Sequence, residues 1–395
     1  MVRCMRADVI VVGGGPAGLL TAYEVASAGF EVVVLEEHKS IGRPSHCAGL
    51  VSVKGLRRLG IRVPSKVIIN DKILCATFVS PSGYRFDIGR GETQAYVIDR
   101  ELFDRYLADL AEKKGVTVLT EHKVTDVRTS NQGRIRVSFK STRGVIEAEA
   151  KCVVIAEGVS CRLSRRLGFA VPRVRLPAVQ HDIEGGDANI DTVELHFGRR
   201  VAPGFFAWVI PLKSDTVRVG VAAYNFPRKR LKKFLIRRFR GSRFKILRKM
   251  GGRVITSGPV RRCVRGGVII VGDTAGHVKP TTGGGVILGG ICARIAGRTV
   301  AGFLEKNATD PRVLLSYDAT WRRVLGREFS AMKMVRFLLN ALTDKILDNL
   351  FKNMEFFHVD ALLERYGDMD FQREVILRGM TSVRVLALAL RSLIP

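Results

Sequence analysis

Three glycines near the N-terminus have the spacing of a dinucleotide-binding turn. A β-branched run, Val9–Val12, leads directly into Gly13, Gly15 and Gly18. Gly13 allows a tight turn, Gly15 lets the backbone approach a pyrophosphate, and Gly18 lets the following helix pack closely on the strand. The pyrophosphate would lie at the helix N-terminus, where free N–H groups and the helix dipole favour an anion. Glu36 follows 18 residues after Gly18 and could accept a hydrogen bond from a ribose hydroxyl.

Two later segments favour FAD as the dinucleotide. In the first, a short apolar strand ends in a turn at Glu157 and Gly158. In the second, an apolar strand delivers Asp273 to the mouth of a loop, ahead of a helix that is expected to start near Gly284. Asp273 could bind ribityl hydroxyls, and the helix dipole could stabilise a reduced flavin anion at its N-terminus. The alternatives are an ordinary helix cap for Asp273 and a plain acidic turn at Glu157.

Together these segments resemble flavoproteins of the aromatic-hydroxylase type. Within that group the chain is most similar to the geranylgeranyl reductases, including the archaeal digeranylgeranylglycerophospholipid reductases. Residues 42–49 resemble the family's cysteine-containing loop, residues 203–211 its Pro-rich Tyr-x-Trp-x-Phe-Pro motif, and residues 317–322 its Tyr-Glu-x-x-Trp-Arg helix. The resemblance covers residues 5 to 330 of the sequence.

The resemblance implies a set of site residues. Cys47 would lie beside the isoalloxazine ring, as a proton donor or as part of the cavity wall, and an inert, packed thiol is the alternative. Phe206, Trp208 and Pro211 would line an apolar slot for an isoprenoid, although Phe206 stands where the family usually has tyrosine. Plain core packing is the alternative for Trp208. The implied FAD contacts are Gly13, Gly15, Ala17, Gly18, Glu36, Cys47, Arg100, Val124, Glu157, Gly158, Asp273, Gly285 and Val286.

The implied activity is an FAD-dependent reduction. A hydride from reduced flavin N5 plus a proton would saturate C=C bonds of geranylgeranyl chains on archaeal-type ether phospholipids or on prenyl diphosphate. The electron donor stays open among ferredoxin, NAD(P)H and others. One alternative is a monooxygenase or halogenase on the same fold, although the flavin-facing lysine and Trp-rich motif of a halogenase are not recognised in the sequence. The other is an RNA-directed flavoprotein that uses the basic segment of the chain.

Basic residues dominate the chain and concentrate in one segment. The net charge is +28, and residues 227–253 contain 13 Lys or Arg and no acid. Leu231, Phe234, Leu235 and Phe239 recur at helical spacing between these bases, which predicts a basic amphipathic helix. We expect it to bind an anionic membrane surface, where each base contributes roughly 1 kcal/mol. An acidic electron-donor protein and a merely solvated face are the alternatives, and a nucleic acid partner is not expected.

The sequence also predicts where the protein resides. No uncharged apolar run reaches the roughly 18 residues that span a bilayer, and the N-terminus enters the first strand without a signal peptide. We therefore expect a cytoplasmic enzyme bound peripherally to the inner face of the cell membrane. The seven cysteines form no CxxC pair, which argues against a zinc or iron–sulfur site.

These sites require an interrupted α/β architecture. The strand–helix–strand pattern of the nucleotide turn predicts a Rossmann-type FAD-binding domain in an α/β (α+β overall) fold. Hairpin-like alternation predicts a mostly antiparallel β-sheet substrate domain, and amphipathic helices follow at the C-terminus. The expected boundaries are 1–65, 96–170 and 255–326 for the discontinuous FAD-binding domain, 66–95 and 171–254 for the β-sheet substrate domain, and 327–395 for the C-terminal helical region.

Overall fold

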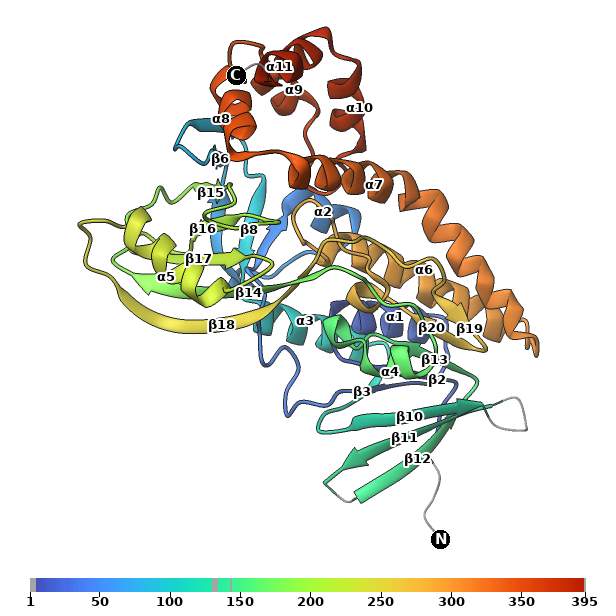
Figure 1. Cartoon of the computed structure of the whole chain (residues 1–395). Coiled ribbons are helices and arrows are strands. Elements are labelled where there is room, and N and C mark those ends of the chain that lie inside the picture. The colour runs from blue at the N-terminus through green and yellow to red at the C-terminus, as the bar shows by residue number, and fades with distance from the viewer. Residues whose placement is uncertain (1–4, 130–133, 143, 394–395) are drawn as a thin grey trace. The chain divides into compact units, whose positions relative to one another are not determined.

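The computed structural model describes residues 5–129, 134–142 and 144–393 (Figure 1). Its internal contacts divide the chain into two units. The first unit comprises Met1–Ser45, Arg100–Val174 and Ser257–Phe329. The second unit comprises His46–Asp99, Arg175–Thr256 and Ser330–Pro395. The expected mixed α/β class with a helical C-terminal region is confirmed.

A mostly parallel sheet forms the centre of the first unit. Its strands follow the order β19-β20-β13-β2-β3-β9, and only β19 and β20 are antiparallel neighbours. Every residue of β2, β3 and β13 is buried, as expected for parallel strands covered on both faces. The strands are Val264–Arg265 (β19), Val268–Ile270 (β20), Cys152–Ile155 (β13), Val9–Val12 (β2), Val32–Leu35 (β3) and Thr117–Leu119 (β9).

Helices and a smaller sheet complete the first unit. The smaller sheet has the order β1-β12-β11-β10, formed by Met5–Arg6, Gly144–Ala150, Ile135–Ser141 and Lys123–Thr129. The helices are α1 (Pro16–Ser27), α3 (Arg100–Glu112), η2 (Gly158–Ser160), α4 (Arg162–Arg166), η3 (Gly272–Ala275), α6 (Val286–Glu305), η4 (Pro311–Leu315) and the first half of α7 (Ser316–Ala341).

Helix α6 packs closely against α1. A Cβ built on Gly297 of α6 would lie 2.6 Å from Cβ of Glu24 and 2.7 Å from the carbonyl oxygen of Thr21. Glycine at this position therefore lets the two helices approach. By length and composition alone, α6 is apolar enough to cross a membrane, and no other helix in the described part of the chain is. Most of its apolar window is buried, as is usual for the core helix of a folded domain.

The second unit is built on a seven-stranded sheet. Its order is β18-β14-β17-β16-β15-β6-β7, antiparallel throughout except between β15 and β6. The strands are Lys245–Ile255 (β18), Arg175–Glu184 (β14), Thr216–Ala222 (β17), Ala207–Pro211 (β16), Thr192–His196 (β15), Cys75–Val79 (β6) and Arg85–Gly89 (β7).

Residues 46–65 also belong to the second unit. Strand β4 (Leu50–Ser52) lies within this segment and pairs with β8 (Ala95–Ile98), which pairs in turn with β5 (Ile68–Ile73). The helices of the unit are α2 (Val53–Arg58), η1 (Ser65–Val67), α5 (Pro227–Arg238), the second half of α7, α8 (Asp344–Asn353), α9 (Val359–Tyr366), α10 (Arg373–Thr381) and α11 (Val383–Leu393).

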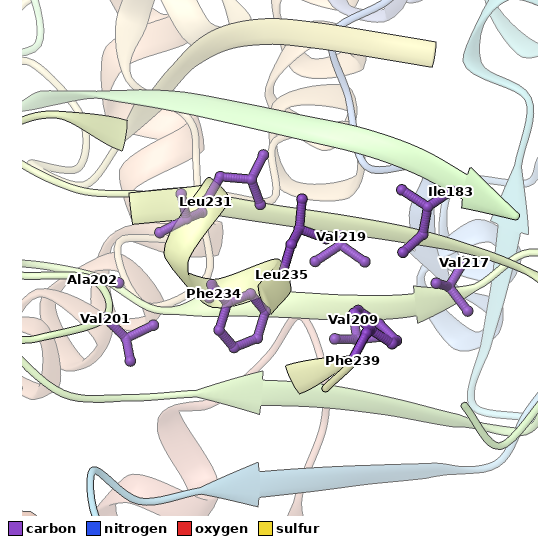
Figure 2. Close-up of a cluster of buried hydrophobic side chains, with 12 residues drawn as sticks. Ile183, Val201, Ala202, Val209, Val217, Val219, Leu231, Phe234, Leu235 and Phe239 are labelled. Carbon is purple, nitrogen blue, oxygen red and sulfur yellow. The ribbon is translucent and has the colours of Figure 1, made fainter. Parts of the chain in front are cut away.

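Helix α5 covers one face of the seven-stranded sheet (Figure 2). The apolar residues that the sequence placed on a stripe of this helix, Leu231, Phe234, Leu235 and Phe239, are buried against β-strand valines such as Val219. The stripe is therefore part of the protein core and does not face solvent.

The prediction of a single basic helix over residues 227–253 is wrong. Helix α5 ends at Arg238, and the segment continues as strand β18, which pairs with β14 at the edge of the sheet. The chain reverses at Gly241, which adopts a φ of 87°, a conformation that glycine reaches without steric cost. Helical periodicity alone did not reveal this turn, because lysine and arginine are compatible with both elements.

Candidate functional site

The three glycines of the turn in the first unit differ in their steric surroundings. Gly13 has a φ of 105°, and a Cβ there would clash with the carbonyl oxygen of Ala156. A Cβ on Gly18 would clash with the carbonyl oxygen of Gly13 and lie 3.2 Å from Cβ of Ala156. Gly15 differs, because a Cβ there would meet nothing within 4 Å. Gly13 and Gly18 thus serve packing, whereas the space beside Gly15 is open.

The open space lies at the N-terminus of α1. Gly15 is the N-cap residue, makes no side-chain cap and is followed by Pro16 at the first helical position. The free N–H groups of the first turn and the positive end of the helix dipole therefore point to an anion that approaches the backbone. A dinucleotide pyrophosphate fits this cradle, and a side chain at Gly15 would fill it.

Glu36 lies next to the same turn, at the end of β3. Its Oε2 accepts a hydrogen bond from the Gly14 N–H (2.8 Å), and its Oε1 accepts one from the His38 N–H (2.9 Å). These bonds fix the carboxylate, and an ionised carboxylate has capacity for further donors such as ribose hydroxyls. Val124 is the second residue of β10 (Lys123–Thr129), and the start of this strand lies near Glu36 because the His122 N–H donates to the Glu36 carbonyl (2.8 Å).

The Asp273 loop reaches α1 and the start of α6. A Cβ on Gly272 would lie 2.6 Å from Cβ of Ala17, and a Cβ on Gly285 would lie 2.7 Å from Oδ1 of Asp273. Gly285 is the N-cap of α6, which begins at Val286. The three predicted cofactor segments therefore converge in the first unit.

Arg100 contributes a positive charge near Asp273. Partial burial raises the pKa of the Asp273 carboxyl, while the charge of Arg100 acts to lower it. Arg100 also donates to both carboxylate oxygens of Asp104, at 3.1 and 3.0 Å. The guanidinium is thus held by its own helix, beside the carboxylate that is predicted to bind the ribityl chain.

The Glu157 side chain has a structural role in addition to any role toward a cofactor. Its carboxylate accepts hydrogen bonds from the N–H groups of Arg162, Leu163 and Ser164, at 2.8 to 3.0 Å. It therefore caps α4. Gly158 follows with a φ of 65° and turns the chain. Contact of Glu157 and Gly158 with FAD stays a prediction, and this turn would present backbone to the cofactor.

A buried histidine, which sequence reasoning did not single out, supports the Asp273 loop. The His277 N–H donates to the Gly272 carbonyl (3.0 Å), and its fully buried ring packs edge-on against Trp321 and Tyr317, with centroids 4.9 and 6.3 Å away. Burial lowers the pKa of His277 to about 3, and the charge of Arg322 acts in the same direction. The aromatic motif at 317–322 could have indicated this packing, because its buried Tyr317 and Trp321 need a neighbouring side chain to pack against.

The predicted substrate residues lie in the second unit. Phe206 precedes β16, while Trp208 and Pro211 belong to it, and all three are buried. Phe205 and Phe206 stack with centroids 4.1 Å apart, and the Trp208 Nε1–H donates to Oε1 of Gln180 (3.3 Å). The sheet thus has an aromatic, apolar face with a few fixed polar groups. Such a composition suits an isoprenoid, and the binding role stays a prediction.

Cys47 also belongs to the second unit. It lies in the loop before β4, is partly exposed, and its Sγ accepts a hydrogen bond from the Gly49 N–H (3.4 Å). The other described cysteines are buried, apart from the partly exposed Cys75 of β6. Cys4 lies outside the described residues. The position of Cys47 relative to a bound flavin stays a prediction.

We expect Asp273→Ala to weaken FAD binding more than it destabilises the fold. A hydrogen bond between a carboxylate and a ribityl hydroxyl contributes about 1.5–3 kcal/mol, or roughly ten- to hundredfold in affinity. Titration of apo-protein with FAD measures the loss of affinity, and urea unfolding of the apo-protein measures the free energy of unfolding. An unchanged affinity would reduce Asp273 to a helix cap.

Comparison with known proteins places these features in a family. The FAD binding domain family matches residues 6–229. A protein named digeranylgeranylglycerophospholipid reductase 2 from Methanothermobacter thermautotrophicus is 32% identical over 360 residues, covering 89% of this chain and 92% of its own. Digeranylgeranylglycerophospholipid reductase 1 from Methanopyrus kandleri is 31% identical, covering 93% and 99%.

Solved structures share the fold. A geranylgeranyl bacteriochlorophyll reductase-like protein from Thermoplasma acidophilum superposes with a TM-score of 0.86 at 23% identity, covering 98% of this chain and 99% of its own. A flavin-dependent brominase superposes with a TM-score of 0.73 at 17% identity, covering 95% and 98%. At these identities the likeness concerns the fold alone.

Proposed function

Since the chain belongs to the geranylgeranyl reductase family of FAD-dependent oxidoreductases, we propose that it saturates C=C bonds of geranylgeranyl chains on archaeal-type ether phospholipids or on prenyl diphosphate. The observation that carries this proposal is the match, over nearly the whole chain, to relatives named digeranylgeranylglycerophospholipid reductase. The open cradle at Gly15 and the buried aromatic strand β16 are the structural features that agree with it.

The two units divide the chemical work in this proposal. When bound, FAD supplies the hydride equivalent from N5 of its reduced form, and an external donor must provide the electrons. The N-terminus of α1 binds the pyrophosphate and Asp273 orients the ribityl chain. Trp208 and Phe206 hold the isoprenoid out of water, and Cys47 delivers the proton or shapes the cavity. Addition of one hydride and one proton converts each C=C bond into a CH–CH bond.

Mass spectrometry tests the reaction directly. The holoenzyme is incubated without oxygen with dithionite and an unsaturated archaeal-type ether lipid, and the molecular mass of the lipid is then measured. A gain of two hydrogens for each reduced bond is the expected result. A gain of oxygen in an aerobic control would instead support the monooxygenase alternative, and an unchanged lipid under both conditions would contradict the proposal.

We expect Cys47→Ala and Cys47→Ser to retain FAD and to slow lipid reduction. The thiol is partly exposed in a loop, so neither change removes core packing. Loss of a positioned proton donor lowers turnover, typically by 10²–10⁴-fold. Flavin absorbance measures retention and lipid mass measures turnover. Full activity of both variants would leave Cys47 with a packing role only.

We further propose that the enzyme is cytoplasmic and meets its lipid at the inner face of the cell membrane, through the basic face of α5 and β18. The apolar stripe of α5 is buried, so the attraction would be electrostatic rather than an insertion of that stripe. Lys232, Lys233, Arg237 and Arg240 are exposed. Arg238 is not available, because it donates to both carboxylate oxygens of Glu194 at 2.6 and 2.7 Å.

We expect charge reversal of Lys232, Arg237 and Arg240 to Glu to release the protein from anionic vesicles. Binding of the unchanged protein should also weaken with salt, because the Debye length falls from about 10 Å at 0.1 M to about 3 Å at 1 M. Co-sedimentation with vesicles containing an anionic lipid measures both effects. Reduction of a detergent-solubilised lipid should stay nearly intact.

A matched control separates local from total charge. Lys113→Glu, Arg173→Glu and Lys306→Glu change three exposed bases of the first unit and shift the net charge equally. This control variant should still bind vesicles. Equal release of both variants, or binding that survives salt, would assign the basic face of α5 and β18 to another partner or to solvation.

A further inference from the structure

The face of the seven-stranded sheet opposite α5 carries buried polar side chains. Arg218 of β17 is 6% exposed, and Gln180 of β14 is 3% exposed. In the antiparallel pairing of these strands, Asp182 lies opposite Arg218, and Gln180 lies opposite Gly220. Buried polar groups destabilise a fold unless they are hydrogen-bonded, so their partners indicate what this polar row does.

Arg218 bridges the sheet and the Cys47 loop. Its Nε and Nη2 donate to the two carboxylate oxygens of Asp182 at 2.7 and 2.9 Å. Its Nη1 donates to the carbonyl oxygen of Ala48 at 2.8 Å. The bidentate pair fixes the plane of the guanidinium, so the third donor is aimed at the loop backbone.

Gln180 holds the loop from the other side of the cysteine. Its Nε2 donates to the carbonyl oxygen of His46 at 3.1 Å, and its Oε1 accepts from the indole N–H of Trp208 at 3.3 Å. The indole is itself fixed, because it lies over Gly220, where a Cβ would clash with the ring. Trp208 thereby sets which way the Gln180 amide faces.

Gln180 and Arg218 thus bind the backbone carbonyls of the two residues on either side of Cys47. Gly49 completes the arrangement with a φ of 82°, and a Cβ there would lie 2.5 Å from the Ile98 carbonyl oxygen and 3.3 Å from Nη1 of Arg218. The backbone on both sides of Cys47 is thus held by hydrogen bonds from the sheet.

We propose that Arg218, with Asp182, and Gln180, with Trp208, are positioning residues that set the orientation of the Cys47 thiol. Trp208 then has a second task beside any contact with an isoprenoid, because it orients the amide that holds the loop. The effect on lipid reduction rests on the proposed function above, whereas the effect on the thiol does not.

Alkylation of Cys47 in the folded protein tests the proposal. Arg218→Lys keeps a positive charge beside Asp182 but cannot make the bidentate pair and reach Ala48 together. Gln180→Glu keeps an acceptor for the Trp208 indole but removes the donor to His46. Both variants should alkylate with iodoacetamide at Cys47 at least tenfold faster, as expected when a loop loses a hydrogen bond that involves a buried or charged group. Peptide mass spectrometry assigns the reaction to Cys47.

The same sheet offers a matched control. Arg238 and Glu194 form a similar bidentate pair on the α5 side of the sheet, with no hydrogen bond to the Cys47 loop among the described contacts. Arg238→Lys should leave Cys47 alkylation within twofold of the unchanged protein, even where it lowers stability. Equal acceleration in all three variants would mean general loosening and would overturn the proposal, as would no acceleration in folded Arg218→Lys and Gln180→Glu.

Two further measurements make every outcome decisive. If Arg218→Lys does not fold, Gln180→Glu and Gln180→Met replace it, and slow alkylation in both would overturn the proposal. In lipid reduction, the two positioning variants should lower kcat and leave KM within about twofold, since they act through Cys47 and not on lipid binding. If the unchanged enzyme reduces no lipid while alkylation follows the expected pattern, the proposed function fails and the positioning role stands.

Discussion

Replacing Gly15 with valine is expected to abolish FAD binding while the first unit stays folded. Gly15 has a φ of −80° and a ψ of 175°, which any residue can adopt, and a Cβ there meets no protein atom within 4 Å. The free energy of unfolding of the apo-protein should therefore change by less than about 1 kcal/mol. The valine side chain would occupy the space that a pyrophosphate needs, so FAD affinity should fall at least hundredfold, or about 2.8 kcal/mol.

Two other glycines supply the comparison. Gly302→Val lies on α6, where a Cβ also meets nothing within 4 Å, and should leave FAD affinity unchanged. Gly18→Val should lose the fold, because its Cβ would clash with the backbone of Gly13. Flavin absorbance after gel filtration and urea unfolding distinguish these cases. A Gly15→Val protein that retains a full complement of FAD would contradict binding of the pyrophosphate in the open space beside Gly15.

Lowering the pH should destabilise the protein through His277, and His277→Phe should remove that contribution. The pKa of the folded-state imidazole is about 3, below the 6.5 of an exposed histidine. As pH falls below 6.5, His277 becomes protonated in the unfolded chain but stays neutral in the folded chain. Stability from this group is complete above pH 6.5 and falls by about 1.4 kcal/mol per pH unit, roughly 4–5 kcal/mol by pH 3.

The difference between the variant and the unchanged protein isolates this effect. Glu194 and His196 of the second unit also have lowered pKa values. Acid therefore lowers the free energy of unfolding through these two groups in both proteins. Phenylalanine keeps an aromatic ring against Trp321 and Tyr317 and has no group to titrate. Urea unfolding at pH 7, 6, 5 and 4 measures both curves, and His181→Phe on β14 serves as the control. Parallel pH curves for His277→Phe and the unchanged protein would show that His277 does not titrate as described.

Local steric requirements explain why the nucleotide turn could be predicted from the sequence. Gly13, Gly15 and Gly18 follow one another closely in the sequence, and the apolar runs on either side fix the parallel strands. The convergence of Asp273 and Gly285 followed for the same reason, since a strand, a loop and a helix start lie next to each other in the chain.

Contacts between distant segments explain what the sequence did not reveal. The periodicity of α5 predicted an apolar stripe correctly, but it carries no information on whether that stripe meets a membrane or a sheet. The grip of Arg218 and Gln180 on the Cys47 loop depends on cross-strand register, which sets Asp182 opposite Arg218. His277 gave no signal of its own, because a histidine in a glycine-rich loop is compatible with many surroundings.

Strand β18 leaves one border of the seven-stranded sheet without a neighbouring strand in the described part of the chain. Residues 245–249 of this border are exposed and include the apolar Ile246 and Leu247, which makes them a template for pairing with another polypeptide. Lys245, Arg248 and Lys249 place like charges along the same stretch, so two such borders repel each other when copies of the chain meet. Repulsion between these bases therefore opposes edge-to-edge pairing of two copies, whether or not the chain also binds a lipid or a protein partner.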